Sequence, residues 1–494
     1  MSSRRVVSAL VALGLGAAGL AFIDPAEAAD SRCGRTNNSV RKLLECVTLE
    51  GVLEHEEALQ RIADDHGGTR ASGTDGYDES VDYVEERLTR AGYVVTRQEF
   101  TFHAFAEVGP SALRQTAPVP TDYVEGTDFG ATPQSEPGDV TAAVTPVDLQ
   151  LGPGNTSTSG CEAVDFAGFP VGNIALIQRG SCTFELKAEN AAAAGAVGVV
   201  FFNQGDTTAP DRNGIPAVTL GDGYTGGIPA VNATYARGVE WADTPGLRMR
   251  LFANVTRRLA TTENLLAETR GGDADNVVMA GAHLDSVPAG PGINDNGSGS
   301  SALIEVAEQM AKLHMKLPNK VRFAWWAAEE ASLVGSTFYV NSLGDEQLAD
   351  LEMYLNFDMV GSPNYGLFIL DGDGSGFGLV GPDGSDDIER LFEGFYEERG
   401  ELTEPKAFDG RSDYQAFINS GVPAGGLFTG AEVIKTPEQA AKWGGTAGQP
   451  FDPCYHAACD TIDNLSSHAL DLNSDAIAYA VYLYASGGEV INQG

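Results

Sequence analysis

The sequence predicts an α/β fold in which a mainly parallel sheet lies between helices and is interrupted by a small β-rich insert. Helix-like and strand-like segments alternate in the first hundred residues and again after residue 255. Acidic and imidazole side chains follow several apolar, strand-like runs, whereas the stretch 109–160 is rich in Pro, Gly, Thr and Ser. Parallel α/β sheets bind ligands beyond the carboxyl ends of their strands. The polar residues at those ends are therefore expected to share one crevice.

The first 28 residues are predicted to be a signal peptide. A basic pair at 4–5 precedes an apolar run at 6–22, and an Ala-Glu-Ala triplet at 26–28 offers the small residues that signal peptidase reads. A membrane anchor is the alternative, but the apolar run is short and a cleavage signal follows it. No later stretch approaches the roughly eighteen apolar residues of a membrane span. We therefore expect a secreted, extracellular chain with no membrane span.

The net charge of −38, from 69 acidic and 31 basic residues in 494, repels nucleic acid and anionic membrane surfaces. Neither is expected as a partner, and a monomer is expected. The charge is compatible with calcium binding, but no motif supports a calcium site. The glycine-rich stretch 372–377 is not a dinucleotide fingerprint, because Phe377 stands where the last glycine is required.

Six cysteines in an exported chain predict disulfides. Six allow 15 pairings, and zinc-thiolate ligation is the alternative use, although no Cys-x-x-Cys pair supports it. Their spacing along the chain favours the pairs Cys33 with Cys46, Cys161 with Cys182, and Cys454 with Cys459.

The first ordered segments predict two or more helices followed by a strand. Apolar residues recur at helical spacing through 40–91, Gly92 is placed to end the last helix, and 93–100 alternates like a strand. This is the opening of an α/β domain.

The middle of the chain has a different order of elements. A strand is predicted at 173–177, an Ala-rich helix at 183–194 and a strand at 197–202, followed by Ile-Pro-Ala-Val at 215–218. The succession resembles the protease-associated domain, a small β-rich insert of several exported peptidases. We expect it to cover 135–254, so that the catalytic domain comprises 29–134 and 255–494. An irregular loop is the alternative, but a hundred structureless residues are unusual in a compact protein.

The stretch 276–300 organises the rest of the chain. A buried strand at 277–282 ends at His283, and Asp285 stands two residues later. Asp295 follows within Asn-Asp-Asn-Gly, just before a helix whose apolar face includes Leu303 and Met310. We interpret this strand–loop–helix as the first half of a two-metal site.

Two later strands are predicted to complete it. The buried run 321–328 leads to Glu329 and Glu330, and the run at 353–357 ends at Asp358. In a parallel sheet these carboxylates face the same crevice as His283. Near the C-terminus, the short loop between Cys454 and Cys459 carries Tyr455 and His456.

The candidate ligands are two imidazoles and three carboxylates: His283, Asp295, Glu330, Asp358 and His456. Imidazole and carboxylate without thiolate suit zinc in a hydrolytic site, with water in the open positions. Two ions that share Asp295 would stand about 3.5–4 Å apart. A lone buried histidine such as His283 is more often a core residue than a ligand, and its acidic neighbours favour the metal.

Three further residues are predicted to take part in catalysis. Neighbours in extended chain point apart, so Glu330 on the metal leaves Glu329 free to act as general base. Asp285 is placed to orient His283, and Tyr455 to donate to an oxyanion. The alternatives are a solvated acidic pair at a helix start for 329–330, and packing beside the disulfide for Tyr455.

These motifs together resemble the co-catalytic di-zinc exopeptidase superfamily, most closely its secreted bacterial leucyl-type aminopeptidases. The motifs lie at 283–285, 294–299, 329–330, 356–358 and 454–456, and the likeness extends through 409–413, 425–430 and 442–449. The resemblance implies a three-layer fold with a mixed, mainly parallel sheet flanked by helices. It implies one zinc on His283, Asp295 and Asp358, and another on Asp295, Glu330 and His456.

The same resemblance assigns Glu329 as base and Tyr455 as oxyanion donor, and places Arg411 and Phe428 in the substrate pocket. An ion pair of Arg411 with Asp409 or Asp413 is the alternative. The resemblance also implies a Glu shortly before the Arg, where it helps to seat the substrate amine. Here Glu404 stands seven residues before Arg411, so the amine anchor stays open.

The expected function is that of a secreted aminopeptidase with two zinc ions, acting on peptides or proteins with a free N-terminus and removing bulky apolar residues. The alternatives within the fold are a carboxypeptidase and a glutaminyl cyclase. A catalytically silent binding protein is the alternative outside enzymes.

Overall fold

The computed structural model describes residues 33–34, 36–205 and 212–488. The predicted signal peptide, 1–28, lies outside the described residues. Among those described, no helix has both the length and the apolar character that crossing a membrane requires. All three predicted disulfides, Cys33–Cys46, Cys161–Cys182 and Cys454–Cys459, are confirmed.

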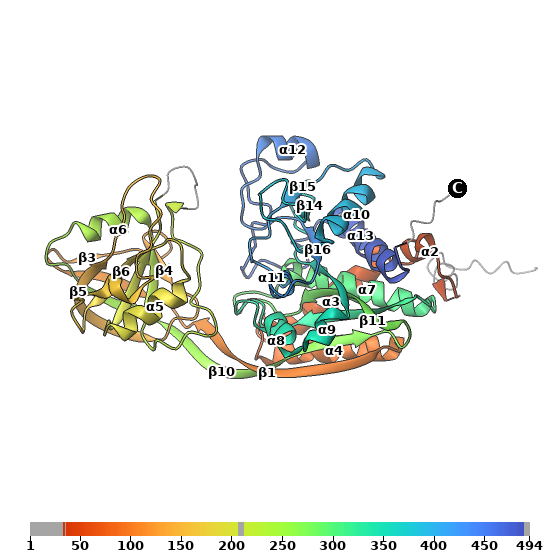
Figure 1. Ribbon diagram of the computed structural model, residues 1–494, viewed down its shortest axis with the longest axis horizontal. Helices are drawn as coiled ribbons and strands as arrows, with labels where there is room; N and C mark the ends of the chain where they lie inside the picture. Colours follow the sequence, from red (N-terminus) through yellow and green to blue (C-terminus); the bar gives the residue numbers. More distant parts are fainter. Residues whose placement is uncertain (1–32, 35, 206–211, 489–494) are drawn as a thin grey trace, which may run out of the picture.

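The chain forms two eight-stranded sheets, one in each of two bodies (Figure 1). In spatial order the central sheet consists of β1 (Val94–Glu107), β10 (Val255–Glu268), β12 (Asn319–Trp326), β11 (Asp273–His283), β13 (Leu351–Phe357), β16 (Ala424–Phe428), β14 (Phe368–Leu370) and β15 (Glu404–Lys406). Strands β12, β11, β13 and β16 are parallel, and antiparallel pairings flank them. The predicted mixed, mainly parallel sheet is confirmed.

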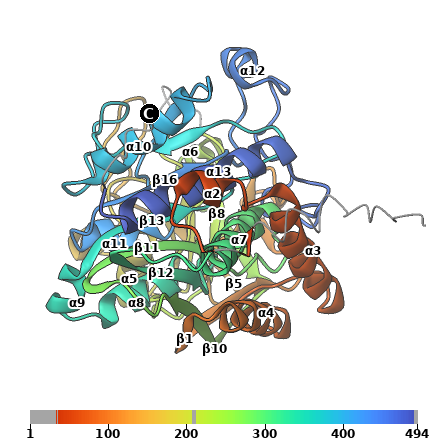
Figure 2. The ribbon, with the colours of Figure 1, turned by 90° about the vertical axis from the view of Figure 1, so that its right-hand side faces the viewer.

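Helices cover both faces of the central sheet. One layer contains α2 (Val40–Leu44), α3 (Leu49–Asp65), α4 (Asp75–Ala91), α7 (Ser298–Lys312), α10 (Ser385–Glu397) and α13 (Ser467–Ala485). The other layer contains α8 (Val334–Ser342), α9 (Asp345–Ala349) and α11 (Tyr414–Asn419). Helix α12 (Pro437–Trp443) lies in the long segment that connects β16 to α13. Figure 2 shows α2, α7 and α13 side by side on one face.

The alternation of side chains along β11 separates the two cores. Val278 and Ala280 belong to the core beneath α7 and α13, whereas Val277 and Met279 belong to the core beneath α8 and α11. Successive strand residues point to opposite faces, so an uninterrupted apolar run is what a sheet buried on both sides requires.

Helix α4 ends at Gly92, as predicted. Gly92 has φ 100° and adopts the left-handed conformation that commonly ends a helix.

The second sheet belongs to the insert. Its strands in spatial order are β3 (Thr121–Asp122), β2 (Ala112–Ala117), β9 (Arg248–Ala253), β5 (Gly138–Val147), β6 (Ile174–Gln178), β7 (Gly198–Phe202), β8 (Ala230–Ala233) and β4 (Phe129–Ala131). Its helices are α5 (Phe184–Ala193) and α6 (Tyr235–Ala242). The predicted strand–helix–strand unit at 173–202 forms as β6, α5 and β7. Strands β2, β3 and β4 precede the expected boundary at 135 and yet pair within this sheet.

A two-stranded ribbon joins the two bodies. β1 and β10 pair without a break from Val94 opposite Glu268 to Glu107 opposite Val255. Only the far end of β10, Leu265 to Glu268, also pairs with β12. Figure 1 shows the insert at the outer end of this ribbon.

Candidate metal centre and active site

The central strands bring their carboxyl ends together at one edge of the sheet. His283 is the last residue of β11, Asp358 follows β13 directly, and Glu329 and Glu330 lie just beyond β12. Since β12, β11 and β13 are parallel neighbours, their ends meet at the same edge. Asp295 lies in the turn between β11 and α7. The sheet topology therefore brings these side chains together at one edge of the sheet.

The five candidate ligands form two overlapping triads. His283 Nε2 lies 3.3 Å from Asp295 Oδ1 and 3.4 Å from Asp358 Oδ1. His456 Nε2 lies 3.3 Å from Asp295 Oδ2 and 3.0 Å from Glu330 Oε2. Within each triad the ligand atoms lie within 4.8 Å of one another. Asp295 thus turns one oxygen to each imidazole, which is the geometry of a bridging carboxylate.

The polar atoms of this cluster fit a pair of zinc ions. Asp358 Oδ1 and Glu330 Oε1 are buried and have no hydrogen-bond partner among the described residues. Each belongs to a different triad, and buried oxygens without partners call for an explanation such as an ion. The nitrogen and oxygen donors match those that zinc accepts in hydrolytic sites.

The charges of the cluster also favour cations. Burial alone would lower the pKa of His456, but the Glu330 carboxylate and Asp295 raise it to about 11. Burial likewise opposes the charged form of His283, and the carboxylates of Glu329 and Asp358 nevertheless hold its pKa well above the usual value. The surrounding carboxylates therefore stabilise positive charge at this cluster, which a bound metal would supply in place of the protons on the two imidazoles.

Asp285 connects His283 to Glu329. The carbonyl oxygen of Asp285 lies 3.0 Å from His283 Nδ1, and its carboxylate oxygen Oδ1 lies 3.5 Å away. The same Oδ1 accepts a hydrogen bond from the backbone N–H of Glu329 at 3.3 Å. The imidazole therefore presents Nε2 to the cluster. The backbone carbonyl, which the sequence did not single out, is the nearer of the two acceptors.

Left-handed backbone recurs at three ligand-bearing segments. Ala328, just before Glu329, has φ 53°, Met359, just after Asp358, has φ 52°, and His456 itself has φ 55°. Such conformations are uncommon for residues other than glycine and cost about 1–3 kcal/mol. The chain therefore turns sharply just before Glu329, just after Asp358 and at His456 itself.

A cavity of about 400 Å³ opens beside the metal cluster. Asp295, Glu329, Asp358 and His456 line one part of it. Its other walls are largely apolar and include Phe368, Leu370, Phe377, Leu427, Phe428, Val433 and Phe451. The cavity thus joins a charged floor to largely apolar walls.

Arg411 lines this cavity and contacts Tyr455. Its guanidinium donates to Glu432 at 2.8 Å and to the Tyr455 hydroxyl at 3.2 Å, so its ion pair is with Glu432 rather than with Asp409 or Asp413. The Tyr455 ring stacks on His456 at 3.8 Å between centroids. Both predicted roles of Tyr455, packing and donation, are therefore compatible with its position.

Glu404 also reaches the cavity, but its carboxylate is already engaged. It accepts hydrogen bonds from Lys442 at 2.6 Å and from Gln439 at 2.8 Å. Each oxygen of the Glu404 carboxylate therefore already accepts a hydrogen bond, and neither is left unpaired for a substrate amine.

Several supporting residues were missed by the sequence analysis. Ser412 donates to Asp358 Oδ2 at 2.6 Å. Asp460 accepts from the backbone N–H groups of Asn294 and Asp295 at 2.9 and 3.0 Å. Ser412 lies inside the motif 409–413 and Asp460 directly follows the Cys454–Cys459 loop, and this closeness to recognised motifs is the signal that could have found them.

Arg70 is a fully buried cation that holds the loop between His283 and Asp295. Its guanidinium donates to the carbonyls of Leu284, Pro291 and Gly292. Burial lowers the pKa of Arg70, and the Glu56 carboxylate opposes that shift. No local sequence signal marks this role, because the contacts span more than 200 residues.

Replacing Arg70 with methionine is expected to lower the free energy of unfolding by about 3 kcal/mol or more, because three buried carbonyls lose their donor and the buried Glu56 carboxylate loses a nearby positive charge. Urea unfolding followed by tryptophan fluorescence measures the change. The exposed Arg61→Met is the matched control and is expected to change stability by less than about 0.5 kcal/mol. Equal stability of the two variants would contradict this role of Arg70.

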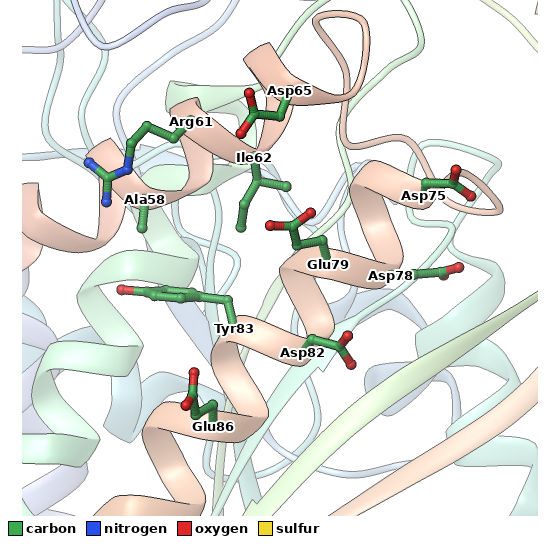
Figure 3. A pocket seen from close by; sticks show the side chains of 10 residues that line it. All are labelled: Ala58, Arg61, Ile62, Asp65, Asp75, Asp78, Glu79, Asp82, Tyr83 and Glu86. Carbon is green, nitrogen blue, oxygen red and sulfur yellow. The ribbon is translucent and has the colours of Figure 1, made fainter.

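A second and larger cavity, about 730 Å³, lies between α3 and α4 (Figure 3). Its lining is mostly acidic: Asp65, Asp75, Asp78, Glu79, Asp82 and Glu86. It contains none of the candidate ligands, so its size does not make it the reaction site.

Comparison with known proteins agrees with the geometry. Residues 264–481 match the model of peptidase family M28, and 140–241 match that of the PA domain. An aminopeptidase of Pseudomonas aeruginosa (strain UCBPP-PA14) is 55% identical over 448 residues, which is 90% of this chain and 83% of the relative. Leucine aminopeptidase 2 of Trichophyton equinum is 41% identical, covering 89% of this chain and 84% of the relative.

Solved structures show the same fold. The aminopeptidase from Aneurinibacillus sp. strain AM-1 superposes with a TM-score of 0.71 at 26% identity, covering 92% of this chain and 98% of that one. A zinc aminopeptidase of Bacillus subtilis gives 0.59 at 24% identity, covering 88% and 94%. From these matches, the chain belongs to peptidase family M28, and within it to the aminopeptidases that carry a PA domain.

Proposed function

We propose that the chain is a secreted aminopeptidase that binds two zinc ions and removes bulky apolar residues from the N-terminus of peptides. The observation that carries this proposal is the pair of triads sharing Asp295 beside a largely apolar cavity. One ion would be held by His283, Asp295 and Asp358, and the other by Asp295, Glu330 and His456.

Zinc bound there would polarise the scissile carbonyl and lower the pKa of the attacking water. Glu329 lines the cavity next to both triads and takes the proton of that water, then returns it to the leaving amine. The Tyr455 hydroxyl, which Arg411 contacts, donates a hydrogen bond to the oxygen that becomes negative. Asp285 contacts both the His283 imidazole and the backbone N–H of Glu329 and so fixes their relative positions.

The cavity walls and the relatives support the substrate class. The aromatic walls suit an apolar first side chain, and the likeness to aminopeptidases supports a substrate with a free N-terminus. We further propose that the inserted domain begins near residue 108, where β1 leaves the ribbon, and ends near residue 254. We also propose that the chain is a monomer exported by way of the 1–28 signal.

Elemental analysis combined with hydrolysis of leucyl anilide and its N-acetylated twin tests the proposal. Two zinc ions per chain, cleavage of the free-amine substrate only, and loss of activity on chelation are expected. Equal cleavage of the acetylated anilide would contradict the requirement for a free amine. Cleavage from the C-terminus or cyclisation of N-terminal glutamine would instead show a carboxypeptidase or a glutaminyl cyclase. Bound metal without activity on any peptide would show a binding protein.

Shortening Phe428 in the apolar wall is expected to impair hydrolysis of a substrate with a large first side chain more than of one with a small first side chain. Phe428→Ala removes a ring that lines the cavity against Phe368, with centroids 6.1 Å apart. The loss of apolar contact, about 1–3 kcal/mol, should lower kcat/KM for leucyl anilide about tenfold or more and leave alanyl anilide nearly unchanged. Steady-state kinetics with both substrates measure the effect. An equal loss on both substrates would contradict a contact between this ring and the first side chain.

A further inference from the structure

The aromatic wall of the substrate cavity continues into a charged residue at the edge of the central sheet. In β14, Phe368 pairs with Phe428 of β16 on one side and with Glu404 of β15 on the other. Side chains that stand directly opposite each other in a sheet share one face, and all three line the cavity. Glu404 therefore extends the row formed by Phe428 and Phe368, and it belongs to the wall of the cavity rather than to the metal triads.

Two side chains of α12 hold the Glu404 carboxylate. Lys442 donates to its Oε1 at 2.6 Å, and Gln439 donates to its Oε2 at 2.8 Å. Gln439 also lines the cavity, whereas Lys442 is not among the described residues that do. The side chains of Lys442 and Glu404 are only 25% and 29% exposed, so solvent screens this ion pair incompletely. Helix α12 thus supplies a positive charge to the wall from behind it.

The other basic side chains of the cavity are already paired. Lys406 pairs with Asp409, and Arg411 pairs with Glu432 at 2.8 Å. Within the described part of the chain, neither forms an ion pair with Glu404. Loss of the Lys442 charge would therefore leave one carboxylate of the cavity wall without a counter-charge.

We propose that Lys442 is a specificity-determining residue, which excludes cationic first side chains from the cavity by neutralising Glu404. The inference rests on the proposed aminopeptidase function and adds to it the charge of the residue that is removed. An ammonium or guanidinium group that enters the cavity loses water and finds Glu404 already paired, so its burial is not compensated. An apolar side chain has no such hydration to lose and packs on Phe368 and Phe428. The wrong substrate is thus rejected by an unfavourable environment as well as outcompeted.

The ion pair leads to two opposite expectations. Lys442→Met keeps an unbranched side chain but removes the charge, so Glu404 becomes available to a cationic first side chain. Glu404→Gln removes the negative charge instead, leaves Lys442 unpaired and favours an anionic first side chain. The double variant, Lys442→Met with Glu404→Gln, is neutral again and should favour neither.

Steady-state hydrolysis of leucyl, lysyl and glutamyl anilides by the zinc-loaded enzyme tests the proposal. In Lys442→Met, the ratio of kcat/KM for lysyl to that for leucyl anilide should rise about tenfold or more. In Glu404→Gln, the ratio for glutamyl to leucyl anilide should rise instead, and the double variant should return both ratios toward those of the parent. Lys316→Met, an exposed change between α7 and β12, is the matched control and should keep the parent ratios.

A purely structural role of the pair gives a different result. If Lys442 and Glu404 only fastened α12 to β15, both variants would lower kcat/KM for all three anilides in the same proportion, and the inference would be wrong. A gain on lysyl anilide that persists in the double variant would also contradict it, because no carboxylate would then attract the cation. Circular dichroism checks folding, and Lys442→Gln repeats the test if Lys442→Met does not fold.

Failure of this inference is distinguishable from failure of the proposed function. If the parent cleaves leucyl anilide and the ratios do not change in the variants, Lys442 does not control the charge of the first side chain, and the aminopeptidase function stands. If the parent cleaves none of the three anilides, both the proposed function and this inference are overturned.

Discussion

Glu329→Gln is expected to lower kcat by about 10³–10⁴-fold while leaving two zinc ions bound. A positioned general base contributes about 10²–10⁴-fold, and in the proposed mechanism the same group also returns the proton to the leaving amine. Glutamine keeps the size of the side chain but does not accept a proton. Glu329 lies beside the metal cluster, with its Oε2 3.9 Å from His283 Nε2, and it belongs to neither ligand triad.

The measurement is single-turnover hydrolysis of leucyl anilide together with zinc analysis of the same preparation. KM should change little, because the substituted group acts on the water rather than on the bound substrate. Full activity would remove Glu329 from the mechanism. Loss of zinc alongside activity would instead make Glu329 a ligand.

Asp295→Ala is expected to remove both zinc ions and to abolish hydrolysis. Its two oxygens face the imidazoles of the two triads at 3.3 Å each, so its loss weakens both sites at once. Glu330→Gln removes a donor from only one triad, and zinc content should fall toward one ion per chain. Glu432→Gln, on the rim beside Arg411, should keep both ions.

Zinc per chain is measured by elemental analysis after dialysis against a weak chelator, and folding is checked by circular dichroism. The informative outcome is the difference between the variants. If Asp295→Ala and Glu330→Gln retain the same zinc content, Asp295 does not bridge two ions.

Much of the fold was predictable because its signals are local. The apolar run of β11 reads as a strand buried on both faces, and the two cores on either side of it follow from that. The aminopeptidase function and the PA insert, predicted from ordered motifs, are confirmed by the family matches and the relatives.

The roles of individual side chains could not be derived to the same depth. The sequence places Glu329 and Glu330 side by side but does not show that left-handed Ala328 turns the chain between β12 and this pair. Arg70 donates to backbone carbonyl oxygens, which every residue carries, so no sequence motif indicates its role. The strands β2 and β4 were also missed, because strands this short in a Pro- and Gly-rich stretch look like loop.

The ribbon of β1 and β10 has a consequence for how this chain is assembled. Its two outer ends, Glu107 and Val255, stand directly opposite each other, so the 147 residues between them (255 − 107 − 1) occupy the place of a hairpin turn. The inserted domain therefore leaves and rejoins the catalytic domain at two neighbouring residues. Exchanging it for a tight turn would leave every strand neighbour of the catalytic sheet as it is.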